Sequence, residues 1–509
     1  MCSINIFQNG SLFKSLMAAT VLMATGCNKI LEIDRPRNTI STETTFDSDG
    51  NANAALAGMY TWMMDGENGS PTVSNGGLSV YAALLSDEVE NRIGNLNPID
   101  EELNVNKIAA NNEGVFDVLW RRPYKAIYSA NAILEGVASS TSPRFTDTTR
   151  KQLAAEAKLA RGFLHFYLVN LFGDVPLMTS TDVTKTANLQ RTPVAEVYKQ
   201  IEQDLKDAFL DLRDNYSVSG GEKVRPNKWA AAAMLARVYL YQQKWAEAEE
   251  QANLVIGSTK YQTQAPGDVF KPNSAESIWQ LRHNEVYEAG QTLVEPRLFV
   301  PMYRYNWLPA DYQVLFLDPS FYEVVSAFML PNYTIRQSLL DAFETDDQRK
   351  VKWIDANPTP NAAPYNGVVH SFPAKYDGLN PDLSTYAPGY YTVLRISEQY
   401  LIRAEARARQ GTDLSGAADD INQIRNKNGL GNTDAATAEQ LLDAILKERR
   451  IEFMAEWGHR WFDLKRFGKA SSVLGAIATK QPWSENKLLM PIPSQEIQKN
   501  PRLTPNPGY

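Results

Sequence analysis

Residues Lys447–Gly468 read KERRIEFMAEWGHRWFDLKRFG and carry the densest structural pattern in the chain. Large apolar residues recur at helical spacing along one side, and acids recur every four residues along another, which predicts an amphipathic helix. Gly458 interrupts this pattern, aromatic residues then resume it, and Gly468 suits the residue after a helix C-terminus. We therefore expect an aromatic wedge packed into the core of the protein.

The acids of this segment, Glu448, Glu452 and Glu456, invite two interpretations. Paired glutamates can act as catalytic acid and base, but only where two carboxylates face each other across a cleft. Here the three share one helix edge with Arg449 and Arg450, which would keep them ionised. Alternating charges are usually a solvated helix face, so we interpret the segment as structural.

Composition narrows the class of protein. A chain of 509 residues with 43% hydrophobic residues can bury a sizeable core, either as several domains or as one large helical domain with insertions. The net charge is −8 and the basic residues are scattered, so no basic stripe indicates a nucleic-acid partner. The 23 Tyr and 10 Trp exceed what a helical core needs, and such rings are good platforms for sugars or peptides.

The N-terminus indicates export. The apolar run LMAATVLMA, residues 16–24, is too short for a permanent membrane helix and fits the core of a signal peptide, residues 1–26. Small residues precede Cys27, as in a lipoprotein cleavage site, so we expect an acylated Cys27 followed by a tether over residues 27–46. The alternative is an ordinary signal peptide with an incidental cysteine. Cys2 is the one other cysteine, so the mature body has no disulfide framework.

Helical patterns dominate residues 47–259. The segment Asp47–Asn51 resembles a calcium loop but lacks its closing Glu, so an N-cap by Ser48 or Asp49 is the preferred interpretation. The loop Asp87–Gly114 is long enough to suggest a function. Thr192 is the expected cap of another helix. The expected helices are Asn51–Met64, Phe116–Val137, a helix within residues 150–178 that is ended by the breaker Gly173-Asp174-Val175-Pro176, Thr192–Asp214, Asn227–Gln242 and Trp245–Ile256.

Two helix pairs have the size pattern of tetratricopeptide repeats, in which a large, a small and an aromatic residue alternate. The first pair is Asn227–Gln242 with Trp245–Ile256, and the second, within the C-terminal part 392–509, is Ser397–Gln410 with Ser415–Lys427. Such pairs cannot bury their own apolar faces and must stack. We therefore expect these distant segments to touch in a mostly α scaffold.

Residues 260–391 interrupt the helical scaffold as an insertion rich in Pro, Gly, Asn and aromatics. We expect loops, short strands and one helix near Ser338–Phe343. A rigid scaffold with an irregular aromatic insert is typical of binding proteins. The alternative is that each ring merely packs the insert onto the helices. The candidate ligand-binding residues are Tyr303, Tyr305, Trp307 and Tyr312, with Asn91, Arg92 and Asn95 from the earlier loop as polar partners.

Motifs for catalysis, phosphate or metal binding are missing from the sequence. It contains no Gly-rich phosphate loop, HExxH, GxSxG or CxxC. Its four histidines are isolated, and His165 lies in an apolar helix, where a satisfied core residue is the better interpretation. We expect no metal and no cofactor. An enzyme would have to rely on two carboxylates, which leaves a glycosidase open.

Several segments resemble the SusD/RagB family of surface nutrient-binding lipoproteins. They are AEAKLARGFLHFYLVNLFGDVP (155–176), LRISEQYLIRAEARARQG (394–411), ERRIEFMAEWGHRWFDLKRFG (448–468) and LLMPIPSQEIQKNPRLTPNPGY (488–509), of which the C-terminal ones are specific. With the cysteine at position 27, the resemblance spans nearly the whole chain, except that the insertion is not specific.

The resemblance implies a helical fold with four tetratricopeptide-like pairs and a variable ligand-binding region. It also implies a non-catalytic, lipid-anchored protein on the outer membrane, facing the cell exterior. Such a protein would bind a glycan and deliver it to a SusC-like TonB-dependent transporter. A surface peptide-binding protein and, further off, a surface glycoside hydrolase remain the alternatives.

Overall fold

The computed structural model describes residues 42–64, 70–282, 293–376 and 389–509. The expected signal peptide, Cys27 and most of the tether therefore lie outside the described residues. The end of the tether forms the short helix α2 (Thr42–Thr45). Within the described ranges no helix is long and apolar enough to cross a membrane.

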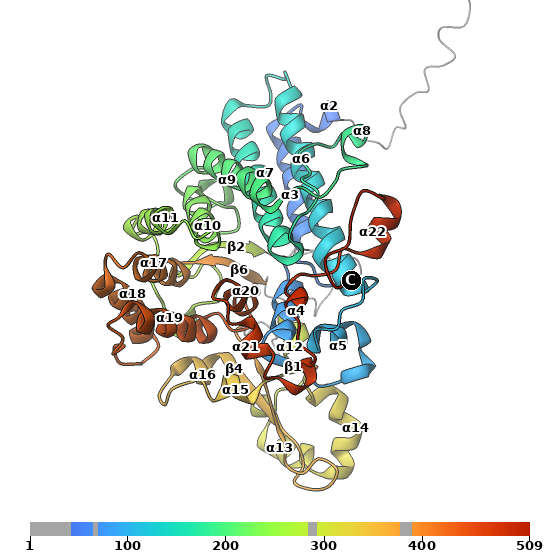
Figure 1. Ribbon diagram of the computed structural model, residues 1–509, viewed down its shortest axis with the longest axis vertical. Helices are drawn as coiled ribbons and strands as arrows, with labels where there is room; N and C mark the ends of the chain where they lie inside the picture. The colour runs from blue at the N-terminus through green and yellow to red at the C-terminus, as the bar shows by residue number, and fades with distance from the viewer. Residues whose placement is uncertain (1–41, 65–69, 283–292, 377–388) are drawn as a thin grey trace, which may run out of the picture.

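Long helices form one continuous array across the upper and left parts of the molecule (Figure 1). Each packs on its neighbour, and α11 packs on α17 although the whole insertion separates them in sequence. This confirms the expected helix pairs and their stacking, and with it the mostly α fold. The array comprises α3 (Asp49–Met64), α6 (Arg122–Ser139), α7 (Asp147–Phe172), α9 (Val194–Asp211), α10 (Lys228–Tyr241), α11 (Trp245–Gly257), α17 (Ile396–Gln410), α18 (Leu414–Lys427) and α19 (Ala438–Glu452).

The start of α3 confirms one cap prediction, and the start of α9 corrects another. Ser48 Oγ accepts a hydrogen bond from the backbone N–H of Asn51, as an N-cap does. Thr192 was expected to cap α9 but instead pairs through its backbone with Val175. The cap comes from Asp174, whose Oδ1 accepts from the Val194 N–H at 2.9 Å. The short segment that ends α7 therefore also supplies the side chain that caps the start of α9.

The segment Lys447–Gly468 is helical, but its first helix stops earlier than the sequence predicts. Helix α19 ends at Glu452, two tight turns follow, and α20 (His459–Arg466) completes the segment. Within the turns Ala455 and Trp457 take left-handed φ angles of 52° and 47°. Tertiary contacts hold that conformation, because the Trp457 N–H donates to Ser79 Oγ and its indole N–H donates to the Thr392 carbonyl. Local periodicity carries no information about such distant partners.

The prediction that the acids of this segment form a solvated face is wrong. Glu448, Glu452 and Glu456 are all buried. Glu452 accepts hydrogen bonds from Arg395 at 2.5 Å, Lys427 at 2.8 Å and Arg349 at 2.9 Å. These cations lie on three other elements, so one carboxylate joins α19 to β6, α18 and α16.

Among the described residues, three two-stranded antiparallel sheets connect the helices. The buried pair β2–β6 lies next to the helical array, where Arg395 at the end of β6 leads directly into α17. The pair β4–β5 belongs to the part of the molecule that projects downward in Figure 1. The pairs are β1 (Val89–Asn91) with β3 (Tyr333–Ile335), β2 (Ser277–Arg282) with β6 (Tyr390–Arg395), and β4 (Ile354–Pro358) with β5 (Val369–Pro373).

The insertion contains more helix than the sequence predicts. Helices are too short there for apolar periodicity to show. The expected helix near Ser338–Phe343 corresponds in part to α15. The helices of the insertion are α12 (Val294–Phe299), the 3₁₀ turns η5 (Pro266–Asp268) and η6 (Tyr305–Trp307), α13 (Ala310–Phe316), α14 (Pro319–Met329), α15 (Gln337–Leu340) and α16 (Gln348–Trp353).

The expected loop Asp87–Gly114 is also partly regular. Asn97 caps α5 by accepting from the Asp100 N–H, and Pro98 occupies its first position. This stretch contributes β1, the 3₁₀ turn η2 (Gly94–Leu96) and α5 (Pro98–Asn104). The remaining short elements are α4 (Gly77–Leu85), the π-helix η3 (Val115–Arg121), α8 (Val183–Thr186), η4 (Ser217–Ser219), α21 (Ala470–Leu474), η7 (Ala478–Lys480), η8 (Glu485–Leu488) and α22 (Ser494–Lys499).

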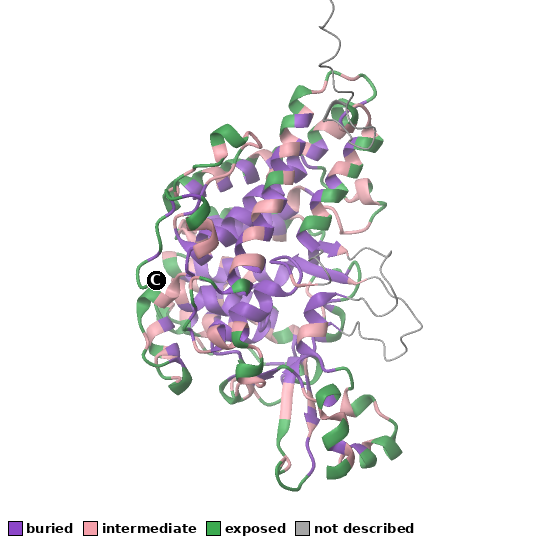
Figure 2. Cartoon of the chain, turned by 90° about the vertical axis from the view of Figure 1, so that its right-hand side faces the viewer, coloured by how far each residue is buried: buried purple, intermediate pink, exposed green. Residues whose placement is uncertain are grey.

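The aromatic wedge lies at the centre of the core, as expected. Trp457 stacks on Tyr167 with ring centroids 5.8 Å apart, and Phe163 meets Trp457 and Trp279 edge-on. Figure 2 shows the buried residues concentrated in the middle of the molecule and exposed ones at its projecting lower end. The scaffold therefore surrounds one main core, and the lower end stands apart from it.

Candidate ligand-binding lobe

The projecting lower end consists of residues 301–332 and 354–373, which we call the lobe. It contains η6, α13, α14 and the hairpin β4–β5 (Figure 1). The lobe has a small hydrophobic core of its own, in which Phe316, Tyr322 and Met329 are buried. Tyr322 packs edge-on against Tyr365 from the hairpin, with centroids 4.8 Å apart. The lobe is therefore a packed unit that can hold surface side chains in place.

Large exposed apolar side chains gather on this lobe. Trp307 is 40% exposed and Tyr312 is 54% exposed. In most proteins the faces of such rings are packed against other groups. Clusters of exposed apolar groups on soluble proteins mark ligand or protein contacts. The exposed large apolar residues of the lobe are Met302, Tyr303, Trp307, Tyr312, Val314, Leu315, Val324, Phe328, Val368 and Val369.

Trp307 is fixed by charged neighbours. The Arg304 guanidinium lies 3.9 Å from the centroid of the Trp307 ring, within cation–π range. Asp355 on β4 binds Arg304 Nε at 2.5 Å and accepts from the Asn306 amide at 3.1 Å. The hairpin thus sets the position of Arg304, and Arg304 sets the position of the ring.

Asn357 links three segments of the lobe through hydrogen bonds, and the sequence analysis did not select it. Its buried amide donates to the carbonyls of Tyr303 at 2.7 Å and Met329 at 2.6 Å, while its Oδ1 accepts from the Tyr305 N–H at 2.8 Å. One side chain therefore links η6, α14 and β4. The signal available in the sequence was Asp318-Pro319, a helix start that would have indicated α14 and hence a folded lobe.

The structure brings the four aromatic candidates from the insertion into this lobe. Tyr303, Trp307 and Tyr312 are exposed there. Tyr305 is half-buried and packs on the small lobe core. The rings of Tyr303 and Phe328 lie 6.3 Å apart, which adds an exposed ring that sequence reasoning did not select.

The three polar candidates occupy different environments. Asn91 is buried, and its amide donates to the Gly94 carbonyl and to Glu101 at 2.9 Å, so it shapes the turn after β1. Arg92 reaches the base of the lobe, where its Nε donates to the Pro331 carbonyl at 2.6 Å; burial lowers its pKa. Asn95 is exposed in that turn.

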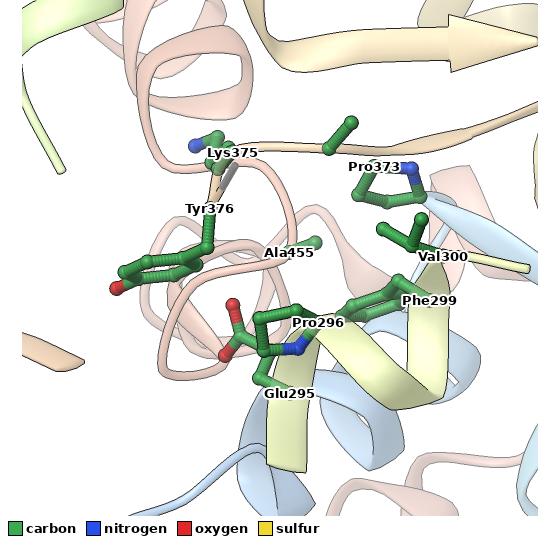
Figure 3. Close-up of a pocket in the computed structure, with 9 residues that line it drawn as sticks. Glu295, Pro296, Phe299, Val300, Pro373, Lys375, Tyr376 and Ala455 are labelled. Atoms are coloured by element: carbon green, nitrogen blue, oxygen red, sulfur yellow. The ribbon is translucent and has the colours of Figure 1, made fainter. Parts of the chain in front are cut away.

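A small cavity lies above the base of the lobe, between α12 and the segment that follows β5 (Figure 3). Burial raises the pKa of Glu295 in its wall to about 7, and the Tyr391 hydroxyl donates to the same carboxylate. The cavity bounded by the described residues has a volume of about 10 Å³, which is room for a single water. A ligand pocket is typically ~300 Å³ or larger, so this acid does not face a substrate-sized space.

Comparisons with known proteins cover both halves of the scaffold. A family model described as "Starch-binding associating with outer membrane" matches residues 37–240, and a model of the SusD family matches residues 327–509. A SusD-like protein of Formosa agariphila is 25% identical over 95% of this chain and 96% of its own length. The starch-binding protein SusD of Bacteroides thetaiotaomicron is 26% identical over 72% of this chain and 74% of its own.

Solved structures show the same fold. A SusD superfamily protein from Bacteroides vulgatus superimposes with a TM-score of 0.73 at 20% identity, covering 91% of this chain and 100% of that one. A laminarin-binding SusD-like protein gives a TM-score of 0.69 at 24% identity with the same coverage. This chain and these two proteins therefore share one fold.

Proposed function

Because this chain belongs to the SusD/RagB family, we propose that it is a non-catalytic outer-membrane lipoprotein that captures a glycan for import. Its lobe binds the glycan, acyl groups on Cys27 hold it to the membrane, and the helical array docks on a SusC-like TonB-dependent transporter. The names of two relatives support a carbohydrate ligand, since one is described as starch-binding and the other as laminarin-binding.

The observation that carries the proposal is the set of exposed rings on a packed lobe. Sugar rings present flat apolar faces that stack on aromatic side chains, and the preorganised Trp307 and the exposed Tyr312 supply such platforms. The exposed Asn306, beside Trp307, supplies hydrogen-bonding groups of the kind that hydroxyls need. Tyr303, Tyr305, Arg92 and Asn95 complete the proposed contact region, and Asn91 shapes its turn.

A peptide ligand is the second candidate, and the aliphatic side chains of the lobe favour it. Val314 is 76% exposed and Val324 is 75% exposed. A glycan gains little from branched aliphatic groups, whereas an extended peptide can bury them. The two ligands differ in which side chains they need, so substitutions separate them.

Catalysis by a pair of carboxylates finds little support in the arrangement of the buried acids. Glu295 and Glu88 both have pKa values that burial raises, to about 7 and about 8. Both lie in the interior, and Glu88 accepts from the Ala455 N–H. A glycosidase needs such an acid beside a bound sugar. Release of reducing ends from a bound polysaccharide by the purified protein would overturn the non-catalytic assignment.

The test compares Trp307→Ala and Tyr312→Ala with Tyr128→Ala, an exposed tyrosine of α6 that serves as the matched control. Loss of one stacking ring should weaken glycan binding about tenfold. Affinity electrophoresis in starch and laminarin gels, with titration calorimetry on oligosaccharides, measures the change. Unchanged affinity in both lobe variants would refute the lobe as the glycan site. The peptide would be favoured if the wild-type protein bound members of a peptide library but no glycan. Val314→Ser and Val324→Ser should then bind those peptides more weakly than the wild type does.

A further inference from the structure

A second depression lies outside the lobe, between α4, α5 and the π-helix η3. Its volume is about 450 Å³, within the range of small-ligand sites. The residues that define it are Tyr81, Ile99, Gly114, Phe116, Asp117 and Arg121. The candidate lobe residues play no part in it.

The Tyr81 hydroxyl lacks a partner in this depression. Tyr81 is 7% exposed, and burial raises the pKa of its hydroxyl well above the usual value. No other described residue donates to or accepts from the hydroxyl. The hydroxyl oxygen is not one of the fully buried unpaired atoms of the described residues, so solvent reaches it from the depression. It can therefore donate to or accept from a hydroxyl group of a bound molecule.

Gly114 lets the start of η3 pack closely against this hydroxyl. Its φ of −65° is an ordinary helical value, so the backbone does not require glycine. A Cβ there would lie 2.8 Å from the Tyr81 hydroxyl oxygen and 2.7 Å from Ile99 Cγ2. A larger residue at this position would therefore displace Tyr81 or Ile99 and change the wall of the depression.

The π-helix forms the polar wall. Such helices are rare and occur frequently at functional sites. Asp117 on η3 binds both Arg121 and Arg122, the latter at 2.6 Å. This carboxylate and the half-exposed Arg121 present acceptors and donors side by side, while the half-exposed Phe116 ring adds an apolar face. Glu113 also lines the depression, so with Asp117 and Arg121 the lining has an excess of acids and disfavours an anionic ligand.

We propose that this depression is a second carbohydrate site, which binds an uncharged sugar unit. The sugar stacks on Phe116, and one of its hydroxyls pairs with the Tyr81 hydroxyl. Others meet the Asp117–Arg121 pair. The inference rests on the proposed function in its choice of ligand class, but uses different residues of the protein.

The test is a titration of the purified full-length protein, labelled on isoleucine and valine methyl groups, with maltohexaose and with laminarihexaose. The Ile99 methyl reports on the depression, and the Val324 methyl reports on the lobe. At least one sugar should shift the Ile99 signal. Tyr81→Phe should weaken that titration about two- to tenfold, the worth of one hydrogen bond, and leave the lobe titration unchanged. Tyr128→Phe, an exposed tyrosine of α6, is the matched control.

The outcomes separate the two proposals. A sugar that shifts the Val324 signal alone overturns the second site and leaves the proposed function standing. Shifts of Ile99 that Tyr81→Phe and Phe116→Ala leave equally strong also overturn it. If neither sugar shifts either signal, both proposals fail.

Discussion

Replacing Glu452 by glutamine should destabilise the whole scaffold. The substitution keeps the size of the side chain and removes its charge, while Arg395, Lys427 and Arg349 stay buried around it. Breaking a buried ion pair from one side costs about 3–5 kcal/mol, because the remaining charge has no counter-charge. Glu276 and Glu456 remain near Arg395, so we expect a value within that range.

The expected loss corresponds to a modest shift in melting temperature. Unfolding entropy is about 2.1 cal/mol/K per residue, so for a chain of 509 residues that unfolds as a unit 1 kcal/mol shifts the midpoint by about 1 °C. Glu452→Gln should therefore lower the midpoint by about 3–5 °C, measured by circular dichroism at 222 nm. Urea titration at 25 °C should show the same loss of free energy.

Glu439→Gln is the matched control, since this glutamate lies on the same helix and is exposed. Its effect should stay within about 0.5 kcal/mol. If Glu452→Gln costs no more than the control, the buried network contributes no net stability and our reasoning about this carboxylate is wrong.

The same variant predicts a pH dependence. Burial by itself would raise the pKa of Glu452, but Lys427, Arg395 and Arg349 hold the pKa well below the ordinary glutamate value of 4.5. A carboxylate with a depressed pKa stabilises the fold fully above its unfolded-state pKa, and that contribution is lost as pH falls through the folded-state pKa. The gap in unfolding free energy between wild type and Glu452→Gln should therefore be full at pH 7 and shrink as pH drops below about 4.5.

Two further substitutions test the lobe and the turn after α19. Asp355→Asn should loosen Arg304 and with it the Trp307 ring, which weakens glycan binding about two- to fivefold in calorimetry, while the melting midpoint changes by less than about 1 °C. Gly458→Ala should cost more stability than Gly468→Ala. Both glycines have positive φ, 73° and 65°, which costs a side-chain-bearing residue about 1–2 kcal/mol. A Cβ on Gly458 alone would also meet the Ala82 Cβ at 2.9 Å, adding about 1–3 kcal/mol in urea titration; equal losses would contradict that clash.

The scaffold could be predicted because its information is local. Helices such as α7 and α10 repeat apolar residues over several turns, and Gly173 ends α7 while Asn227 caps the start of α10. The stacking of α11 on α17 followed from the principle that helix pairs must bury their faces, although the two lie far apart in sequence.

The environment of the acids in Lys447–Gly468 could not be predicted in the same way. The spacing of Glu448 and Glu452 placed them on one helix face, and on an isolated helix a charged face meets water. Their partners Arg349 and Arg395 come from segments about 50 to 100 residues away. A helical pattern thus indicates which residues share a face, but it does not indicate what covers that face.

In the lobe, local sequence predicted the exposed rings but not the polar groups that position them. Composition singled out Tyr303, Trp307 and Tyr312, because aromatic residues crowd a stretch without helical periodicity. The groups that position them, Asp355 and Asn357, lie about 50 residues further on in a hairpin and show no pattern of their own. Rings that meet ligand and polar groups that orient the rings therefore come from separate segments, joined at η6. A change of ligand would require new side chains on η6 and α13, whereas the hairpin and the helical array could stay as they are. This is the arrangement expected where one scaffold serves variable recognition.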